Sequence, residues 1–154
     1  MADSKTLLWV DDDGKERFLY EQYNLEKRGW SITWSLTVLE AARNLEEKPF
    51  DAVLLDQTLP PQRYEDEPSY WGGCALLYWL RGGERLQDTT DFDFLGELTP
   101  RGHNQNIGVT LVSAFYDDQV MGYVKKAPGP LVELVQKPIG LAHLLSCLEG
   151  SSQK

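Results

Sequence analysis

Short apolar runs alternate with helix-like segments along most of this chain. Continuous apolar runs at residues 6–10, 52–55, 107–112 and 131–135 predict strands buried on both faces, and the alternating residues 30–35 predict a strand with one wetter face. Segments with helical character lie between and after the strands, at residues 14–28, 37–45, 74–81, 117–126 and 141–148. This order predicts an α/β fold whose parallel sheet is built with right-handed crossovers.

Local signals mark the ends of several predicted helices. Thr37 and Glu40 have the spacing of a capping box, which predicts a helix start, and Pro49 lies just beyond the expected end of that helix. Gly29 and Gly82 are well placed to end the helices that precede them.

Two segments interrupt the alternation and are predicted to be insertions, at about residues 61–72 and 84–106. Loops that follow strands lie at the carboxyl ends of a parallel sheet, so we expect the first insertion and its acids at 65–67 to border any pocket there. The second precedes a strand, and we expect a mostly irregular segment at the opposite end. A short tail is expected at residues 150–154.

The composition fits one domain that spans residues 1–154. Hydrophobic residues make up 42% of the chain and include five Trp, which is enough for a substantial core. The formal net charge of −9 argues against direct binding of nucleic acid, which needs a basic face. Neither a signal sequence nor a run of membrane-spanning length is present, so we expect a cytoplasmic protein with no membrane partner.

The cysteines and histidines carry no metal-binding pattern. Cys74 and Cys147 lack CxxC spacing and lie in apolar helix-like stretches, so we interpret both as reduced core thiols. His103 and His143 have no ligand partner at metal spacing and are interpreted as structural or surface residues.

Charged residues close three of the apolar runs. The acids 11–13 follow the first run, Asp56 closes the run at 52–55, and Lys137 with Pro138 follows the last. Each has a plain explanation when taken alone, as a helix start, a loop residue or a strand stop. In an open parallel sheet, however, the ligand crevice lies outside the carboxyl ends of the strands, so the three groups are predicted to converge on one pocket.

With these residues in order, the chain resembles the CheY-like receiver domain of two-component response regulators. The resemblance rests on four segments at strand ends: LLWVDDD, DAVLLDQTLP, VTLVSA and LVQKP. It covers nearly the whole chain apart from the two insertions. It implies a doubly wound, five-stranded parallel sheet of order 2-1-3-4-5 with helices on both faces, as in the flavodoxin-like folds.

The resemblance also implies a magnesium site. Asp11, Asp12 and Asp56 repel one another when they are packed together, and a hard divalent cation holds such carboxylates ionised side by side. By the family pattern, Asp12 and Asp56 bind Mg²⁺ directly, the backbone carbonyl of Thr58 completes the protein ligands, and Asp11 acts partly through water.

Three further roles follow from the same resemblance. Asp56 is the phosphorylated residue, Lys137 supplies a fixed positive charge to the phosphoryl group, and the hydroxyl of Ser113 turns inward to transmit the switch. A cis peptide bond is expected before Pro138.

One position departs from the family pattern. Receiver domains usually carry an aromatic residue on the last strand, three residues before the lysine, and this chain has Leu134 there. The switch is therefore weakened, or another ring such as Tyr116 or Tyr123 takes this role.

The function implied by the resemblance is that of a stand-alone receiver rather than an enzyme. It takes a phosphoryl group from a sensor histidine kinase or phosphotransfer protein and presents a changed surface to a downstream protein effector. A pseudo-receiver that never accepts phosphate remains an alternative, although the acid pair, the acceptor and the lysine are all present. An aspartyl-nucleophile phosphatase is a weaker alternative, because such enzymes need a second acid where this chain has Thr58. A homodimer through the last helix is left open.

Overall fold

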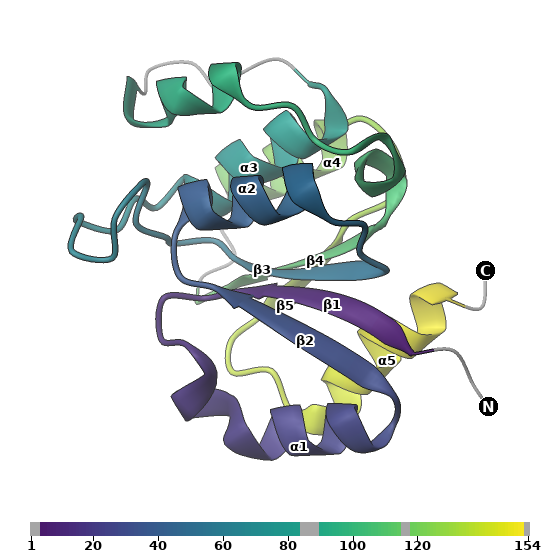
Figure 1. Cartoon of the computed structure of the whole chain (residues 1–154). Helices are drawn as coiled ribbons and strands as arrows, with labels where there is room; N and C mark the ends of the chain where they lie inside the picture. Colours follow the sequence, from purple (N-terminus) through teal and green to yellow (C-terminus); the bar gives the residue numbers. More distant parts are fainter. Residues whose placement is uncertain (1–3, 84–89, 115–117, 153–154) are drawn as a thin grey trace.

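The computed structural model describes residues 4–83, 90–114 and 118–152 of the chain. One parallel sheet in the order β2-β1-β3-β4-β5 forms the centre of the molecule, which is the order that the resemblance implied (Figure 1). The strands are β1 Lys5–Val10, β2 Trp30–Ser35, β3 Ala52–Asp56, β4 Gly108–Ser113 and β5 Glu133–Gln136.

Helices cover both faces of this sheet. Figure 1 shows α2, α3 and α4 on one face and α1 and α5 on the other. The α-helices are α1 Leu19–Lys27, α2 Val38–Glu47, α3 Gly72–Arg81, α4 Asp118–Lys126 and α5 Leu141–Ser152. Three 3-10 segments add to them: η1 Lys15–Phe18, η2 Thr90–Glu97 and η3 Gly102–Asn106.

The side-chain alternation of the strands divides the core into two layers. On β1, Leu8 and Val10 belong to the larger layer with α2, α3 and α4, whereas Leu7 and Trp9 belong to the smaller layer with α1 and α5. Successive residues of a strand point to opposite faces, so apolar runs buried on both sides are what a covered parallel sheet requires.

Several element boundaries differ from the predictions. The first helix region opens as the 3-10 turn η1, and the α-helix begins only at Leu19. The last strand begins at Glu133, because Leu131 is 88% exposed and lies outside the sheet. The last helix continues to Ser152, so residues 150–152 of the predicted tail are helical, and residues 153–154 lie outside the described residues.

The capping signal of α2 is confirmed. The Glu40 backbone N–H donates to the Thr37 hydroxyl at 3.1 Å. The free N–H groups of Val38 and Leu39 donate to the carbonyls of Pro60 and Pro61 at 3.0 and 2.9 Å. These bonds satisfy donors that every helix start leaves open.

The same bonds explain why the position expected for the first insertion was wrong. They direct the chain after β3 toward the start of α2, and none of residues 61–72 lines the cleft described below. The loop is closed by a two-bond bridge between Leu59 and Ser69. Asp66 is used within the loop, where it accepts from the N–H groups of Gln62 and Arg63.

The second insertion is more ordered than predicted in the part that the structure describes. Phe92 and Leu95 of η2 join the larger core layer. Asn104 of η3 is fully buried: its amide donates to the carbonyls of Leu45 and Lys48, and its oxygen accepts from the Phe50 N–H. These contacts fix η3 beside the amino end of β3, the end at which the insertion was expected.

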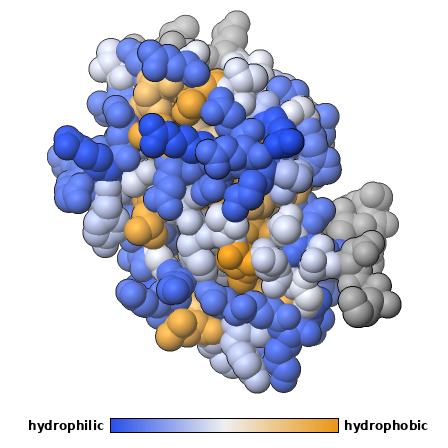
Figure 2. All heavy atoms as spheres, in the orientation of Figure 1, coloured by the Kyte–Doolittle hydropathy of each residue, from blue (hydrophilic) through white to orange (hydrophobic). Residues whose placement is uncertain are grey.

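The outer surface agrees with a strongly acidic chain. Figure 2 shows a mostly hydrophilic face, with apolar side chains in small separate groups, one of them where Figure 1 draws η1 and α1. Cys74 and Cys147 are both buried, and neither is in a disulfide. In the described part of the chain, no helix combines the length and the apolar character needed to cross a membrane.

Candidate functional site

The carboxyl ends of three strands bring the predicted charged residues together. Asp11 follows β1, Asp56 ends β3 and Lys137 follows β5. Carboxylate oxygens of Asp11, Asp12 and Asp56 lie within 4.8 Å of one another. Residues 45 positions apart in sequence thus share one small volume because parallel strands end at the same edge of the sheet.

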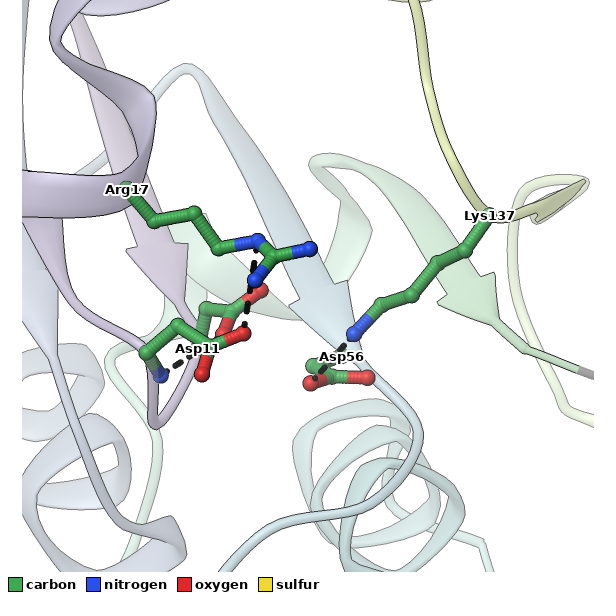
Figure 3. Close-up of polar contacts among 5 residues, drawn as sticks. Asp11, Arg17, Asp56 and Lys137 are labelled. Atoms are coloured by element: carbon green, nitrogen blue, oxygen red, sulfur yellow. Dashed lines mark hydrogen bonds and ion pairs between the residues drawn. The ribbon is translucent and has the colours of Figure 1, made fainter.

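Lys137 completes this cluster from the opposite side. Its Nζ lies 3.0 Å from Oδ2 of Asp56 and donates a hydrogen bond to it (Figure 3). Its backbone N–H donates to the carbonyl of Ser113 at 2.8 Å, which ties it to the end of β4. The peptide bond between Lys137 and Pro138 is cis, as expected.

Burial makes these acids hard to ionise. Asp11 is only 3% exposed, and its burial and then the charge of Asp56 raise its pKa from 3.8 to about 7. Burial also raises the pKa of Asp56, although the charge and hydrogen bond of Lys137 oppose this. For Asp12, burial and then the charge of Asp13 raise the pKa.

Lys137 responds to the same charges in the opposite sense. Burial alone would lower the pKa of Lys137, but the charge and hydrogen bond of Asp56 outweigh it, so the pKa is raised. The ammonium is therefore a permanent positive charge at neutral pH.

The donor set fits a hard divalent cation. Three carboxylates whose oxygens lie within 4.8 Å, two of them buried, repel one another unless a cation neutralises them. Oxygen ligands of this kind are those that Mg²⁺ and Ca²⁺ prefer. The backbone N–H of Thr58 lies at hydrogen-bonding distance of the Asp56 carboxylate and lowers its pKa; that its carbonyl binds the metal remains a prediction.

A cleft of about 490 Å³ opens beside this cluster. Its polar end holds Asp11, Asp56 and Lys137. Its apolar wall comes from the α1 and α5 face of the sheet and from the segments around it, namely Trp9, Phe18, Leu54, Val112, Pro138 and Ile139. The Asp56 carboxylate therefore lines a cleft with an apolar floor.

An aromatic stack supports that floor. The ring of Trp9 lies 4.5 Å from Trp34 and 4.7 Å from Phe18, measured between ring centroids. The indole N–H of Trp34 donates to Gln22 of α1 at 2.8 Å. This stack fixes the position of η1 and α1 beside the site.

Sequence reasoning missed two residues that shape the site. Arg17 of η1 lines the cleft, although nothing in the chain spacing separates it from other surface arginines. Gln57 is buried directly after Asp56; its amide donates to the Tyr70 carbonyl at 2.6 Å, and its oxygen accepts from the thiol of Cys74. The sequence gives no sign that Gln57, a polar residue between Asp56 and a loop, is buried.

The start of α3 packs directly on the backbone of Asp56. A Cβ atom added to Gly73 would lie 2.5 Å from the carbonyl oxygen of Asp56 and 2.8 Å from Leu111. The Gly73 N–H also donates to the carbonyl of Gln57 at 2.9 Å. Only glycine permits this close approach.

Two of the residues predicted for the switch, Ser113 and Tyr123, lie on different elements. Ser113 is buried at the end of β4, one residue beyond Val112, which is paired with Asp56. Tyr123 of α4 packs edge-on against Trp71, which directly precedes α3, and against Tyr78 of α3, with centroids 5.4 and 5.9 Å apart.

Leu134 and Tyr116 are the other two positions that were named for the switch. Leu134 is partly buried and packs against the larger core layer, whereas Tyr116 lies outside the described residues.

Solved structures that are similar to this chain include receiver domains and response regulators. A Francisella response regulator receiver domain is 18% identical, with a TM-score of 0.66, and the match covers 97% of this chain and 98% of that one. The receiver domain of a Pseudomonas aeruginosa sensor histidine kinase, solved with magnesium in its active-site cleft, is 16% identical with a TM-score of 0.66 over 98% and 99% of the chains. A Burkholderia pseudomallei response regulator with a phosphorylated aspartate and a calcium ion is 16% identical, with a TM-score of 0.62 over 97% and 70%.

The chain therefore has the CheY-like fold of response regulator receiver domains. No family model matches its sequence. No curated protein matches it either.

Proposed function

We propose that this protein is a receiver that accepts a phosphoryl group on Asp56 in a Mg²⁺-dependent reaction and thereby switches a protein–protein surface in two-component signalling. One observation carries the proposal: the oxygens of Asp11, Asp12 and Asp56 cluster within 4.8 Å, and Lys137 reaches the same Asp56 at 3.0 Å. The stability of the fold does not account for this cluster, because buried acids that repel one another destabilise a fold.

The residues divide the work of phosphoryl transfer. A carboxylate oxygen of Asp56 attacks phosphorus, and the bond from phosphorus to the donor's nitrogen or oxygen breaks, with its electron pair leaving on the donor. A donor imidazole then recovers a proton from solvent. Lys137 favours the ionised Asp56 beforehand and offsets the oxygen charges of the group that is transferred.

A divalent cation would be held by Asp11, Asp12 and Asp56, and when bound it supplies charge neutralisation at the phosphoryl oxygens. The buried carboxyl of Asp11 is the group that most needs this cation, since its pKa is raised to about 7.

Partner binding is proposed on the exposed side of α1. Leu19, Tyr20 and Tyr23 are 60%, 67% and 61% exposed, although large apolar side chains are usually buried. They lie on the helix that follows Arg17 and Phe18 at the cleft. A sensor kinase or phosphotransfer protein that covers this row would bring its phosphohistidine to Asp56.

The effect of phosphorylation is proposed to reach a downstream effector through Ser113 and α4. Ser113 lies at the end of β4, directly before the segment that leads to α4. Tyr123 on α4 is 37% exposed and contacts α3, so a shift at the end of β4 would change this surface.

The test is labelling with acetyl phosphate and Mg²⁺, followed by intact mass. We expect a phosphoryl adduct on the parent protein, loss of the adduct in Asp56→Asn, and a parent-like adduct in Asp91→Asn, which removes an exposed acid of η2. Chelation of Mg²⁺ should abolish labelling. Steady release of phosphate would indicate a hydrolase, and no adduct with any donor would indicate a pseudo-receiver.

Docking on α1 is tested separately. Tyr20→Ser should leave labelling by acetyl phosphate unchanged but slow transfer from phosphorylated kinase or phosphotransfer domains. Leu131→Ser is the matched control, because Leu131 is exposed outside the sheet and far from α1 in sequence. Equal slowing in both variants would contradict the docking face.

A further inference from the structure

Arg17 stands on the rim of the cleft that holds Asp11, Asp56 and Lys137. Figure 3 shows its side chain extending from η1 across Asp11, with the guanidinium on the side of the cleft that faces Lys137. The two cations that line the cleft thus come from different elements, η1 and the segment after β5.

The present partner of Arg17 is held loosely. Its Nε lies 3.6 Å from Oδ2 of Asp13, which is longer than a hydrogen bond, and the two side chains are 66% and 45% exposed. An exposed ion pair of this kind contributes little to stability, so the guanidinium can exchange partners at small cost. Lys137, by contrast, is hydrogen-bonded to Asp56.

The charges around the cleft create a need for this second cation. Asp11, Asp56 and Glu21 line it together with Lys137 and Arg17. Phosphoryl donors are anions, and the chain as a whole carries a formal charge of −9, so their approach is opposed unless cations at the rim offset it. A guanidinium suits the task because its planar N–H groups match two phosphoryl oxygens at once.

We propose that Arg17 is a second cationic contact for the phosphoryl donor, releasing Asp13 to bind the oxygens of the incoming group while Lys137 serves the opposite side. The proposal rests on the phosphoryl-accepting role of Asp56 and adds the residue that captures the donor. The ligand class is an anionic phosphoryl donor, whether a small acyl phosphate or a phosphohistidine.

The kinetic test compares three variants in labelling by acetyl phosphate with Mg²⁺. Arg17→Gln should lower the second-order rate of labelling about 3- to 10-fold, and Arg17→Lys should restore part of it. Arg43→Gln, which removes an exposed arginine of α2, should react like the parent protein. Added salt should reduce the difference in rate between the parent and Arg17→Gln, because screening weakens the attraction of the charge that the variant lacks.

A second measurement separates this proposal from the function on which it rests. In the Mg²⁺-loaded protein, inorganic phosphate should shift the Nε–Hε NMR signal of Arg17 but not that of Arg43. If Asp56 is never labelled but this shift appears, the proposed function fails and the contact stands. If Asp56 is labelled and Arg17→Gln reacts as fast as Arg43→Gln, the contact is refuted and the function stands; if neither labelling nor shift occurs, both fail.

Discussion

The buried Asp11 carboxyl should make the metal-free protein lose stability as the pH rises. In the unfolded chain this group ionises near 3.8, whereas in the folded protein its pKa is about 7 because of burial and the charge of Asp56. As the pH rises, the unfolded state therefore releases the proton first and is favoured. Folding stability from this group falls between about pH 4 and about pH 7, and the loss is complete above that range.

The size of this loss of stability follows from the pKa shift of Asp11. About three pH units at about 1.4 kcal/mol each give an upper limit of about 4 kcal/mol, and relaxation around the charge reduces it to about 2–4 kcal/mol. Asp11→Asn removes the charge but keeps an oxygen that accepts from the Asp13 N–H, a bond of 2.9 Å in the parent. The variant should thus be more stable by about 2–4 kcal/mol above about pH 7.5, and equal to the parent below about pH 4.

The assay is urea unfolding followed by Trp fluorescence, with chelator, at the two ends of this pH range. Glu16→Gln, an exposed acid of η1, is the charge-matched control and should change stability by less than about 0.5 kcal/mol. Adding Mg²⁺ should stabilise the parent more than Asp11→Asn. If Asp11→Asn is no more stable than the parent above about pH 7.5, the reasoning from buried repulsion is wrong.

Three further changes test other parts of the structure. Gly73→Ala, whose new Cβ would lie 2.5 Å from the Asp56 carbonyl, should cost about 1–3 kcal/mol in urea unfolding, whereas Gly122→Ala, with no atom within 4 Å, should gain about 0.5–1 kcal/mol; similar values for both would contradict the close approach. Lys137→Ala should slow labelling of Asp56 by at least about 10-fold, measured by intact mass over time, and an unchanged rate would remove Lys137 from the chemistry. Asn104→Ala should cost about 2–5 kcal/mol in the same unfolding assay because it breaks three hydrogen bonds, two of them buried; a loss below about 0.5 kcal/mol would argue against that network.

Patterns of apolar residues were sufficient to predict the parallel sheet, and the resemblance to receiver domains implied the order of its strands. A strand buried on both faces leaves a continuous apolar run, and the alternation of strands with helices permits few topologies. The charged residues at the strand ends could be predicted for the same reason, since parallel strands direct Asp56 and Lys137 to one edge.

Tertiary structure alone decided features that depend on contacts between distant segments. The first insertion turns away from the cleft because the α2 start has N–H groups that the Pro60 and Pro61 carbonyls satisfy. The second is anchored by Asn104, whose three partners lie more than 50 residues earlier. Neither group of hydrogen bonds corresponds to a periodic pattern in the sequence.

The candidate site also combines features that the sequence predicts with features that only the folded structure shows. The sequence by itself determined which acids and which lysine meet, because register at strand ends is a local property of the pattern. Only the folded structure showed that Arg17 shares their cleft and that Gln57 is buried against α3. Their positions depend on how η1 and α3 pack against the sheet, and packing of side chains across elements is not encoded in the spacing of any one segment.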